Sequence, residues 1–346
     1  MGAPPRQTPP KETFPREKCF LYWNLSLMRT FRLLALFLVA APAIILIGRF
    51  LRADARDASE TITVDGRERT YRLHVPSTYD ETKRVPLVLA LHGRLGTGEG
   101  QERLSHFNEV SDDHGFIVAY PDGIDRSWSD GRGKTPAEEK GVDDVKFLSE
   151  LIRKLESQYK IDPGRVYAMG MSNGGFMSGR LACDLADQIV AVGIVGASVS
   201  TNTAATCRPA KPVSVMIIQG TEDPLVPFAG GALGKNGDRG EVLSHDAAVK
   251  KFAALNHCPG PPQHPTLEAA ADDGTSIQVT AYEGCARGTS VEGFTVVGGG
   301  HTWPGGMQYA PAAMIGKTTH NLNASEAIWN FFATHSRARF DPEHTH

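Results

Sequence analysis

The sequence predicts an α/β protein in which a mostly parallel central sheet carries helices on both faces. Near-continuous apolar runs of strand length alternate along the chain with stretches of helical hydrophobic spacing, which is typical of this class. With 346 residues, of which 41% are hydrophobic, the chain can bury one substantial core. The net charge of −3 gives no support to nucleic-acid binding, which requires a basic surface.

The N-terminal part differs in composition from the rest of the chain. Residues 1–27 begin with a polar, proline-rich stretch, so we expect them either to lack structure or to precede a true start at Met28. Arg29 and Arg32 then stand before an uncharged apolar run, as in the first part of a secretory signal. We therefore predict that residues 28–56 are a signal peptide or an N-terminal membrane anchor.

The apolar run itself leaves the choice between cleavage and retention open. Its uncharged stretch, residues 33–48, is short for a membrane span, although Phe50 and Leu51 extend it. An Ala-x-Ala cleavage site is present at residues 53–55, but neighbouring arginines weaken it. A buried core helix is the third alternative. We expect export whether the segment is cleaved as a signal peptide or retained as an anchor. If it is retained, residues 31–51 would attach the protein to a membrane.

Four cysteines after the apolar run favour disulfide bonds. Cys183, Cys207, Cys258 and Cys285 permit three pairings, and no Cys-x-x-Cys metal spacing occurs among them. Bonds between sequence neighbours would close loops of about 25 residues and stabilise the protein by about 3 kcal/mol each. Four buried free thiols are the alternative. Because disulfides persist in oxidising compartments, we expect a secreted protein, periplasmic or extracellular.

The strands are predicted in order from their hydrophobic patterns. In "TITVDGRERTYRLHV", apolar and polar residues alternate around Asp65-Gly66, which indicates a β-hairpin. Near-continuous apolar runs then indicate strands that are buried on both faces. We expect these strands at Val85–Leu91, Phe116–Tyr120, Arg165–Gly170, Ile189–Ala197 and Val213–Gly220, and further strands near Ile277–Tyr282 and Phe294–Val297.

Helices are predicted where apolar residues recur at helical spacing. The clearest example is Asp143–Lys160, which acidic residues open and in which an apolar stripe runs from Val145 to Tyr159. Further helices are expected at Asn173–Leu185, Ser244–Leu255 and Ala324–Phe332. Because neither an internal repeat nor a second core is visible, we predict one domain at residues 59–337 and a tail at residues 338–346.

The pentapeptide Gly170-Met171-Ser172-Asn173-Gly174 matches G-x-S-x-G between a predicted strand and a predicted helix. This is the context that the nucleophile motif requires. On so sharp a turn, Cβ atoms at the two glycines would collide with neighbouring elements, and the following helix directs backbone N–H groups toward an oxyanion. We therefore predict that Ser172 is a nucleophile. A helix-capping serine is the alternative.

A serine hydroxyl becomes a good nucleophile only when a base accepts its proton and a carboxylate orients that base. Asp223 follows a predicted strand in "IIQGTEDPLVPF", and His301 lies among glycines in "VVGGGHTWPGG". This order of serine, acid and histidine suits the motif. We predict Asp223 as the acid, rather than Glu222 or a carboxylate that only stabilises a turn, and His301 as the base, rather than a structural histidine.

Two backbone N–H groups are predicted to bind the oxyanion. One belongs to Asn173, directly after the serine. The other is expected in the loop "LALHGRLGTGEG", where Arg94 is the first choice and Leu95 the second.

Glycine-rich segments elsewhere do not complete a phosphate-binding motif. Gln101 stands where G-x-G-x-x-G needs its last glycine, and Pro311 stands where a P-loop before Lys317 needs its first. The sequence contains no H-E-x-x-H. We predict neither a metal nor a cofactor.

With these motifs in place, the chain resembles the polyhydroxybutyrate depolymerase-like esterases, which are related to feruloyl esterases of carbohydrate esterase family 1. The resemblance covers most of the chain after residue 60 and is carried by several motifs in family order. These motifs are "LALHGRLGTG", "YPDG" with "SWSDGRG", "GMSNGG", "GTEDPLVPF", "GGGHTWPGG" and "AIWNFF".

The resemblance implies an α/β-hydrolase fold and ester cleavage. It places Ser172, Asp223 and His301 on the catalytic triad of the family. It also places Arg94 and Asn173 on the oxyanion positions. Arg94 stands where many relatives carry a smaller residue or cysteine, a departure that keeps the backbone N–H.

We therefore expect a serine esterase that hydrolyses carboxylic esters through an acyl-enzyme intermediate. Trp303, Trp128, Tyr120 and Met171 are the candidate walls of the substrate site, with ordinary core packing as the alternative for the aromatic side chains. Because 14 residues follow Phe332, we expect small esters or soluble oligomers, either hydroxyalkanoate or feruloyl, rather than crystalline polymer. An acyltransferase with the same triad and a non-catalytic binding protein are the alternative functions.

Overall fold

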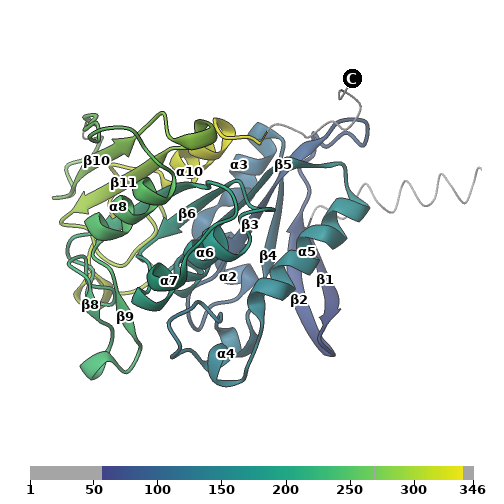
Figure 1. Cartoon of the computed structure of the whole chain (residues 1–346), viewed down its shortest axis with the longest axis horizontal. Coiled ribbons are helices and arrows are strands. Elements are labelled where there is room, and N and C mark those ends of the chain that lie inside the picture. The colour runs from purple at the N-terminus through teal and green to yellow at the C-terminus, as the bar shows by residue number, and fades with distance from the viewer. Residues whose placement is uncertain (1–56, 269, 338–346) are drawn as a thin grey trace, which may run out of the picture. The chain divides into compact units, whose positions relative to one another are not determined.

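The computed structural model describes residues 57–268 and 270–337, which Figure 1 shows in colour. The predicted N-terminal extension, the predicted signal peptide or anchor and the predicted tail lie outside these residues. Within the described ranges, no helix combines the length and the apolar character that a membrane crossing requires.

Nine strands form the central sheet in the order β1-β2-β4-β3-β5-β6-β7-β11-β10 (Figure 1). Strands β4, β3, β5, β6, β7 and β11 run parallel, whereas β1, β2 and β10 pair antiparallel toward the two edges. The strands are β1 Asp57–Val64, β2 Arg67–His74, β3 Val85–Leu91, β4 Ile117–Pro121, β5 Ile161–Met171, β6 Ala191–Val195, β7 Ser214–Gly220, β10 Ser276–Tyr282 and β11 Val291–Val297. A second, two-stranded sheet pairs β8 Gly231–Ala232 with β9 Glu241–Val242.

Helices cover both faces of the central sheet, so the predicted α/β architecture is confirmed (Figure 1). Helices α5, α6 and α8 lie over one face, and α2, α3 and α10 lie over the other. The helices are α2 Gly98–Ser105, α3 Phe107–His114, α4 Pro136–Glu139, α5 Asp144–Gln158, α6 Asn173–Asp184, α7 Thr201–Thr206, α8 His245–Leu255, α9 Ala312–Ile315 and α10 Ala324–Ala333.

The inner strands are apolar because both of their faces are buried. Every residue of β4, β6 and β7 is buried, and β3 is buried from its second residue onward. Strands of this kind read as continuous apolar runs rather than as alternating ones. The edge strand β1 alternates instead, since only one of its faces packs against the core.

The predicted hairpin is confirmed. Strands β1 and β2 pair in register across a two-residue turn in which both Asp65 and Gly66 have positive φ, at 51° and 70°. A turn of this kind matches the twist of the flanking strands.

The glycine-rich loop after β3 contains two helices, α2 and α3, which the sequence patterns did not predict. His106 separates them in a left-handed conformation, with φ of 51°, and ends α2. Each helix has only eight residues, so neither has room for several repeats of the helical hydrophobic pattern.

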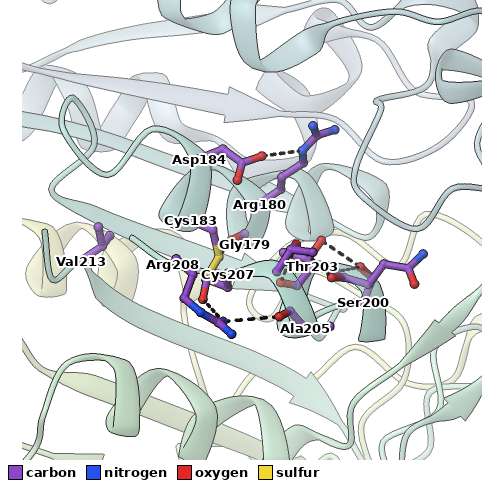
Figure 2. The surroundings of a disulfide bond; sticks show 12 residues. Gly179, Arg180, Cys183, Asp184, Ser200, Thr203, Ala205, Cys207, Arg208 and Val213 are labelled. Carbon is purple, nitrogen blue, oxygen red and sulfur yellow. Dashed lines mark hydrogen bonds and ion pairs between the residues drawn. A yellow bond between two sulfur atoms is a disulfide. The ribbon is translucent and has the colours of Figure 1, made fainter. Parts of the chain in front are cut away.

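Two disulfide bonds join sequence neighbours, which resolves the pairing that the sequence left open. The Cys183–Cys207 bond connects the last turn of α6 to the C-terminal end of α7 (Figure 2). The Cys258–Cys285 bond connects the segment after α8 to the segment before β11. The first bond therefore joins the ends of two helices, and the second joins two loop segments.

Candidate active site

Ser172 lies on a strained turn between β5 and α6. Its backbone has φ of 55° and ψ of −117°, a region that residues with a side chain rarely occupy. A Cβ atom at Gly170 would lie 2.5 Å from the carbonyl carbon of Gly174, and one at Gly174 would lie 2.2 Å from the Leu91 oxygen. Only glycines permit this close approach, so the motif builds the turn that carries the serine.

Asp223 and His301 form a direct hydrogen bond. The distance from His301 Nδ1 to Asp223 Oδ2 is 2.7 Å, and both side chains are buried. The other carboxylate oxygen accepts hydrogen bonds of 2.8 Å from the backbone N–H groups of Leu225 and Val226. Because Nδ1 faces a carboxylate, it carries the ring proton of the neutral imidazole, which leaves Nε2 as an acceptor.

The loop that carries His301 is fixed on both sides of the residue. The backbone N–H of His301 donates to the Ile315 carbonyl at 2.6 Å, and the His301 carbonyl accepts a hydrogen bond of 2.7 Å from the Tyr309 hydroxyl. Burial, with the nearby charge of Asp223, raises the pKa of Tyr309 to about 12. The phenol therefore stays protonated and keeps donating at neutral pH.

The backbone also brings the serine turn close to the imidazole. The Ser172 N–H donates to the Val195 carbonyl at 2.8 Å. The next residue, Gly196, has φ of +56°, and a Cβ atom there would lie 3.4 Å from His301 Nδ1. Ser172 and His301 line the same cavity. Within the described ranges, no hydrogen bond joins the Ser172 hydroxyl to His301.

The two predicted oxyanion donors lie near Ser172. Asn173 is the first residue of α6, so its N–H has no acceptor inside the helix. Arg94 follows Gly93, where a Cβ atom would lie 3.5 Å from Ser172 Cβ. In the described part of the chain, the Arg94 N–H makes no hydrogen bond. The second choice, Leu95, donates its N–H to the Arg126 carbonyl at 2.8 Å and is therefore already occupied.

His92 holds the Arg94 loop, a role that the sequence patterns did not suggest. Its Nδ1 lies 2.8 Å from the Gly93 carbonyl, and its Nε2 accepts a hydrogen bond of 2.9 Å from the Gly123 N–H. The Trp128 indole N–H donates to the His92 carbonyl at 2.9 Å. Burial lowers the pKa of His92, and a neutral ring with one donor and one acceptor satisfies both contacts.

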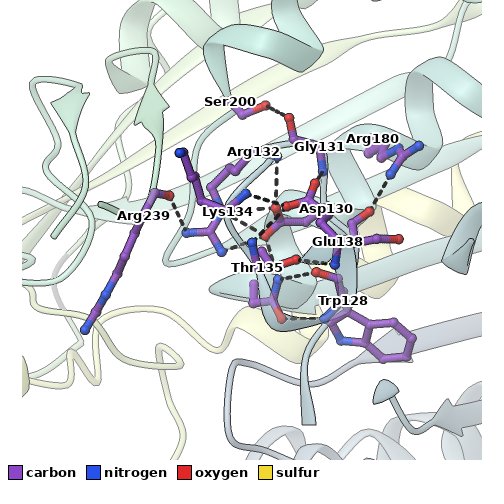
Figure 3. A network of polar contacts seen from close by, with 12 residues as sticks. Trp128, Asp130, Gly131, Arg132, Lys134, Thr135, Glu138, Arg180, Ser200 and Arg239 are labelled. Atoms are coloured by element: carbon purple, nitrogen blue, oxygen red, sulfur yellow. Dashed lines mark hydrogen bonds and ion pairs between the residues drawn. The ribbon is translucent and has the colours of Figure 1, made fainter. Parts of the chain in front are cut away.

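A buried polar network fixes the side chain of Asn173, and Figure 3 shows its Trp128, Asp130 and Arg132 members. Its oxygen accepts a hydrogen bond of 2.8 Å from the backbone N–H of Trp128, and its nitrogen donates to Asp130 at 2.5 Å. Arg132 donates to the same carboxylate at 2.7 Å and 2.9 Å. Burial raises the pKa of Asp130, while the Arg132 charge opposes the rise. This network ties the start of α6 to the segment after β4.

The cavity beside Ser172 has a volume of about 560 Å³, within the usual range for small-molecule sites. About half of its lining residues are apolar or aromatic, and they come from loops, from α2, α6 and α9, and from the end of β5. They are Leu95, Leu104, Met171, Phe176, Leu225, Val226, Leu233, Met307, Tyr309 and Ile315. In the described part of the chain, no cluster of three His, Cys, Asp or Glu side chains could hold a metal ion.

Comparison with known proteins decides the family. The sequence profile of the family described as "Esterase PHB depolymerase" matches residues 69–227. The curated protein named "Putative esterase NocK", from Nocardia uniformis subsp. tsuyamanensis, is 34% identical over 310 residues, which are 84% of this chain and 88% of that protein. The chain belongs to the PHB depolymerase esterase family. It is therefore an esterase that acts on carboxylic esters, and the resemblance that the motifs predicted is confirmed.

Other relatives support the same conclusion. The protein named "Feruloyl esterase B", from Piromyces equi, is 31% identical over 65% of this chain, which corresponds to 41% of that longer protein. Among solved structures, an acetyl xylan esterase from Aspergillus awamori superimposes with a TM-score of 0.54 at 15% identity. It covers 80% of this chain and 99% of its own, and at this identity the match shows the shared α/β-hydrolase fold.

Of the four candidate substrate walls of this esterase, only Met171 lines the cavity. The structure places the three aromatic side chains in the core, as the alternative interpretation held. The indole N–H of Trp303 donates to Ser325, and the Tyr120 hydroxyl donates to Asn108. The indole N–H of Trp128 donates to the His92 carbonyl. Each is at most 1% exposed, so none can contact a substrate.

Gln101 is a cavity residue that the sequence patterns did not identify. Its side chain is 2% exposed and lines the cavity, yet neither its amide oxygen nor its amide nitrogen has a hydrogen-bond partner within the described ranges. A buried amide without partners is unfavourable by about 1–3 kcal/mol. The amide can both donate to and accept from a ligand in the cavity.

Proposed function

We propose that this esterase is a serine hydrolase in which Ser172 is the nucleophile, His301 the general base and Asp223 the orienting acid. The observation that carries the proposal is the 2.7 Å contact between His301 and Asp223 beside the cavity that Ser172 lines. The contact leaves Nε2 of the imidazole free to accept a proton, which a serine hydroxyl needs before it can attack an ester.

In the first half of the reaction, Ser172 Oγ forms a bond to the ester carbonyl carbon while its proton moves to His301 Nε2. The negative charge that develops on the carbonyl oxygen accepts hydrogen bonds from the Arg94 and Asn173 backbone N–H groups. The bond between the carbonyl carbon and the alkoxy oxygen then breaks, and His301 returns its proton to that oxygen. The products are a free alcohol and an acyl-Ser172 ester.

In the second half, water replaces the alcohol. His301 accepts a proton from the water molecule as its oxygen bonds to the acyl carbon. The bond to Ser172 Oγ then breaks, and the imidazole returns the proton to the serine. The carboxylic acid leaves and the enzyme is restored. Asp223 stabilises the imidazolium in both halves without taking a proton itself.

We infer small esters or soluble ester oligomers as substrates, including hydroxyalkanoate and feruloyl esters. The apolar lining and volume of the cavity suit compact acyl or aryl groups, and relatives carry the names of feruloyl esterases. Within this proposal, residues 59–337 form the catalytic domain.

We also propose that the protein acts outside the cytoplasm, in the periplasm or the extracellular medium. Its two disulfide bonds favour an oxidising compartment. Residues 28–56, which lie outside the described residues, would then supply the signal peptide or the anchor.

The test of the proposed function is the variant Ser172→Ala, measured on short-chain nitrophenyl, hydroxybutyrate-oligomer and feruloyl esters. We expect kcat to fall roughly 10⁴-fold or more. A fluorophosphonate should label the wild-type protein and not the variant. The control is Ser157→Ala, because Ser157 is exposed on α5 and should leave both readouts unchanged. Activity in Ser172→Ala equal to that of the wild type would refute the proposal.

A further inference from the structure

The cavity beside Ser172 concentrates positive charge, although the protein as a whole is slightly acidic. Four arginines are among its described lining residues, and no aspartate or glutamate is. They come from separate segments of the chain: Arg94 after β3, Arg103 on α2, Arg132 before α4, and Arg239 between β8 and β9. A protein with a net charge of −3 gives no general reason for this concentration.

Two of the four arginines have acidic partners within the protein. Arg132 donates to the buried Asp130 at 2.7 Å, and its guanidinium packs over the Phe176 ring. Arg103 pairs with Glu99 one helical turn earlier at 3.3 Å. These two side chains have partners that offset their charge.

The other two arginines keep their charge available. In the part of the chain that the structure describes, neither Arg94 nor Arg239 forms an ion pair, and both side chains are exposed at the cavity. Asp238 precedes Arg239 in the sequence but does not pair with it. Arg239 is held only by its backbone, whose N–H donates to the Leu233 carbonyl at 3.2 Å. Figure 3 shows its side chain extending away from the Asp130 network.

The apolar lining and the unpaired guanidinium groups together favour a ligand that has both an apolar part and an anionic group. The walls exclude water from an apolar group, and an exposed, unpaired guanidinium at the cavity attracts an anion by a charge interaction that salt screens. Guanidinium binds carboxylate in a planar, two-bond geometry. Because Arg94 and Arg239 both line this cavity, an ester bound beside Ser172 can present an anionic group to a guanidinium.

We propose that this esterase selects esters that carry a free carboxylate in addition to the scissile ester, and that the unpaired guanidinium groups of Arg94 and Arg239 attract this carboxylate to the cavity. The proposal rests on the proposed function, because it assigns a substrate class to the same cavity. The proposal predicts faster cleavage of carboxylate-bearing esters than of neutral esters of the same size.

The test compares two matched substrate pairs. On the acyl side, 4-nitrophenyl hydrogen adipate is compared with 4-nitrophenyl methyl adipate. On the alcohol side, the butyrate ester of 4-hydroxybenzoate is compared with the butyrate ester of methyl 4-hydroxybenzoate. We expect kcat/KM for the anionic member of at least one pair to be about tenfold higher, and the preference to shrink as ionic strength rises from about 0.02 M to about 0.5 M.

Variants assign the effect to residues. Arg239→Gln and Arg94→Gln should each lower the ratio of anionic to neutral kcat/KM about fivefold, mainly through the KM of the anionic ester. The matched control is Arg153→Gln on α5, since Arg153 is exposed outside the cavity and should leave the ratio unchanged.

The outcomes separate this proposal from the proposed function. Equal kcat/KM in both pairs, or a preference that neither cavity variant changes, would overturn the carboxylate proposal while leaving the serine mechanism intact. If no ester of either pair is cleaved, or if Ser172→Ala cleaves them as the wild type does, the proposed function itself fails.

Discussion

The segments around Asp223 and Asp130 place the same buried group in two different settings. Asp223 accepts from two backbone N–H groups and from the His301 imidazole, whose charge can change. Asp130 accepts from the Arg132 guanidinium and the Asn173 amide, neither of which titrates near neutral pH. The difference teaches that burial of a carboxylate does not by itself indicate chemistry. The partner does: a titratable ring can relay a proton, whereas a guanidinium and an amide can only hold the backbone in place.

The contrast between the two aspartates would fail if Asp223, like Asp130, only supported the fold. In Asp223→Asn, the amide nitrogen can donate to His301 Nδ1, which moves the ring proton to Nε2 and removes the acceptor that the proposed nucleophile Ser172 would need. We expect kcat to fall about 10⁴-fold, measured by steady-state ester hydrolysis, with a thermal melt close to that of the wild type. The control is Glu222→Gln, the neighbouring acid, which should stay within about twofold. A variant at Asp223 that keeps a tenth of the activity would contradict the assignment.

At Asp130 we expect the reverse of Asp223: removal of the carboxylate should lower stability strongly. Asp130→Ala leaves the nearly buried Arg132 charge and the Asn173 amide without their partner. We expect the free energy of unfolding in urea to fall by about 3–5 kcal/mol. The exposed pair of Asp184 with Arg180 supplies the control, since Asp184→Ala should cost less than about 1 kcal/mol. Equal losses in the two variants would mean that the Asp130 network does not support the fold.

A pH titration sharpens the comparison on the Asp223 side, where His245 supports the loop after the aspartate. The backbone N–H of His245 donates to the Phe228 carbonyl at 3.0 Å, and the two rings stack. Burial lowers the pKa of His245 to about 4, whereas an unfolded histidine titrates near 6.5. The unfolded state therefore binds more protons between these values, and stability falls as pH drops through this window, by up to about 3 kcal/mol.

The measurement is the urea midpoint from pH 7 to pH 4 for the wild type and for His245→Gln. In the variant, the slope of the free energy of unfolding against pH should decrease by the contribution of about one bound proton, because glutamine does not titrate. His320→Gln, at an exposed position, should keep the wild-type slope. Identical slopes in the wild type and His245→Gln would contradict the expectation.

The smallest predicted effect lies at Gln101, which lines the cavity. Gln101→Leu removes a buried amide without partners, so we expect the free energy of unfolding to rise by about 1 kcal/mol. If the amide contacts substrate, kcat/KM should fall at the same time. Thermal melts and ester kinetics on one preparation check both. A variant that is less stable than the wild type would show that the amide has a structural partner.

The parts that could be predicted from the sequence are those that depend on local pattern. The buried strands, the hairpin at Asp65-Gly66 and the turn around Ser172 follow from periodicity and from glycine positions within a few residues. The disulfide pairing required spatial information, since four cysteines allow three pairings.

The cavity could not be predicted in the same way. Its walls come from loops and helices that are distant in sequence, so no local pattern marks Phe176 or Ile315 as lining residues. The buried aromatics show the converse problem, because a sequence gives the size of Trp303 but not whether its ring faces a cavity or the core. Gln101 was visible only as a missing glycine, and nothing in its neighbours indicates that its amide is buried without partners.

The backbone of Ser172 has an evolutionary consequence. Glycine would adopt φ of 55° and ψ of −117° without the steric conflict that a Cβ atom creates there. Many random substitutions that destabilise the domain are purged, yet a change to glycine at this position would be tolerated by the fold. Under the proposed mechanism, only selection for turnover preserves the hydroxyl, and a lineage relieved of that selection would be expected to lose it early while the sheet around it persists.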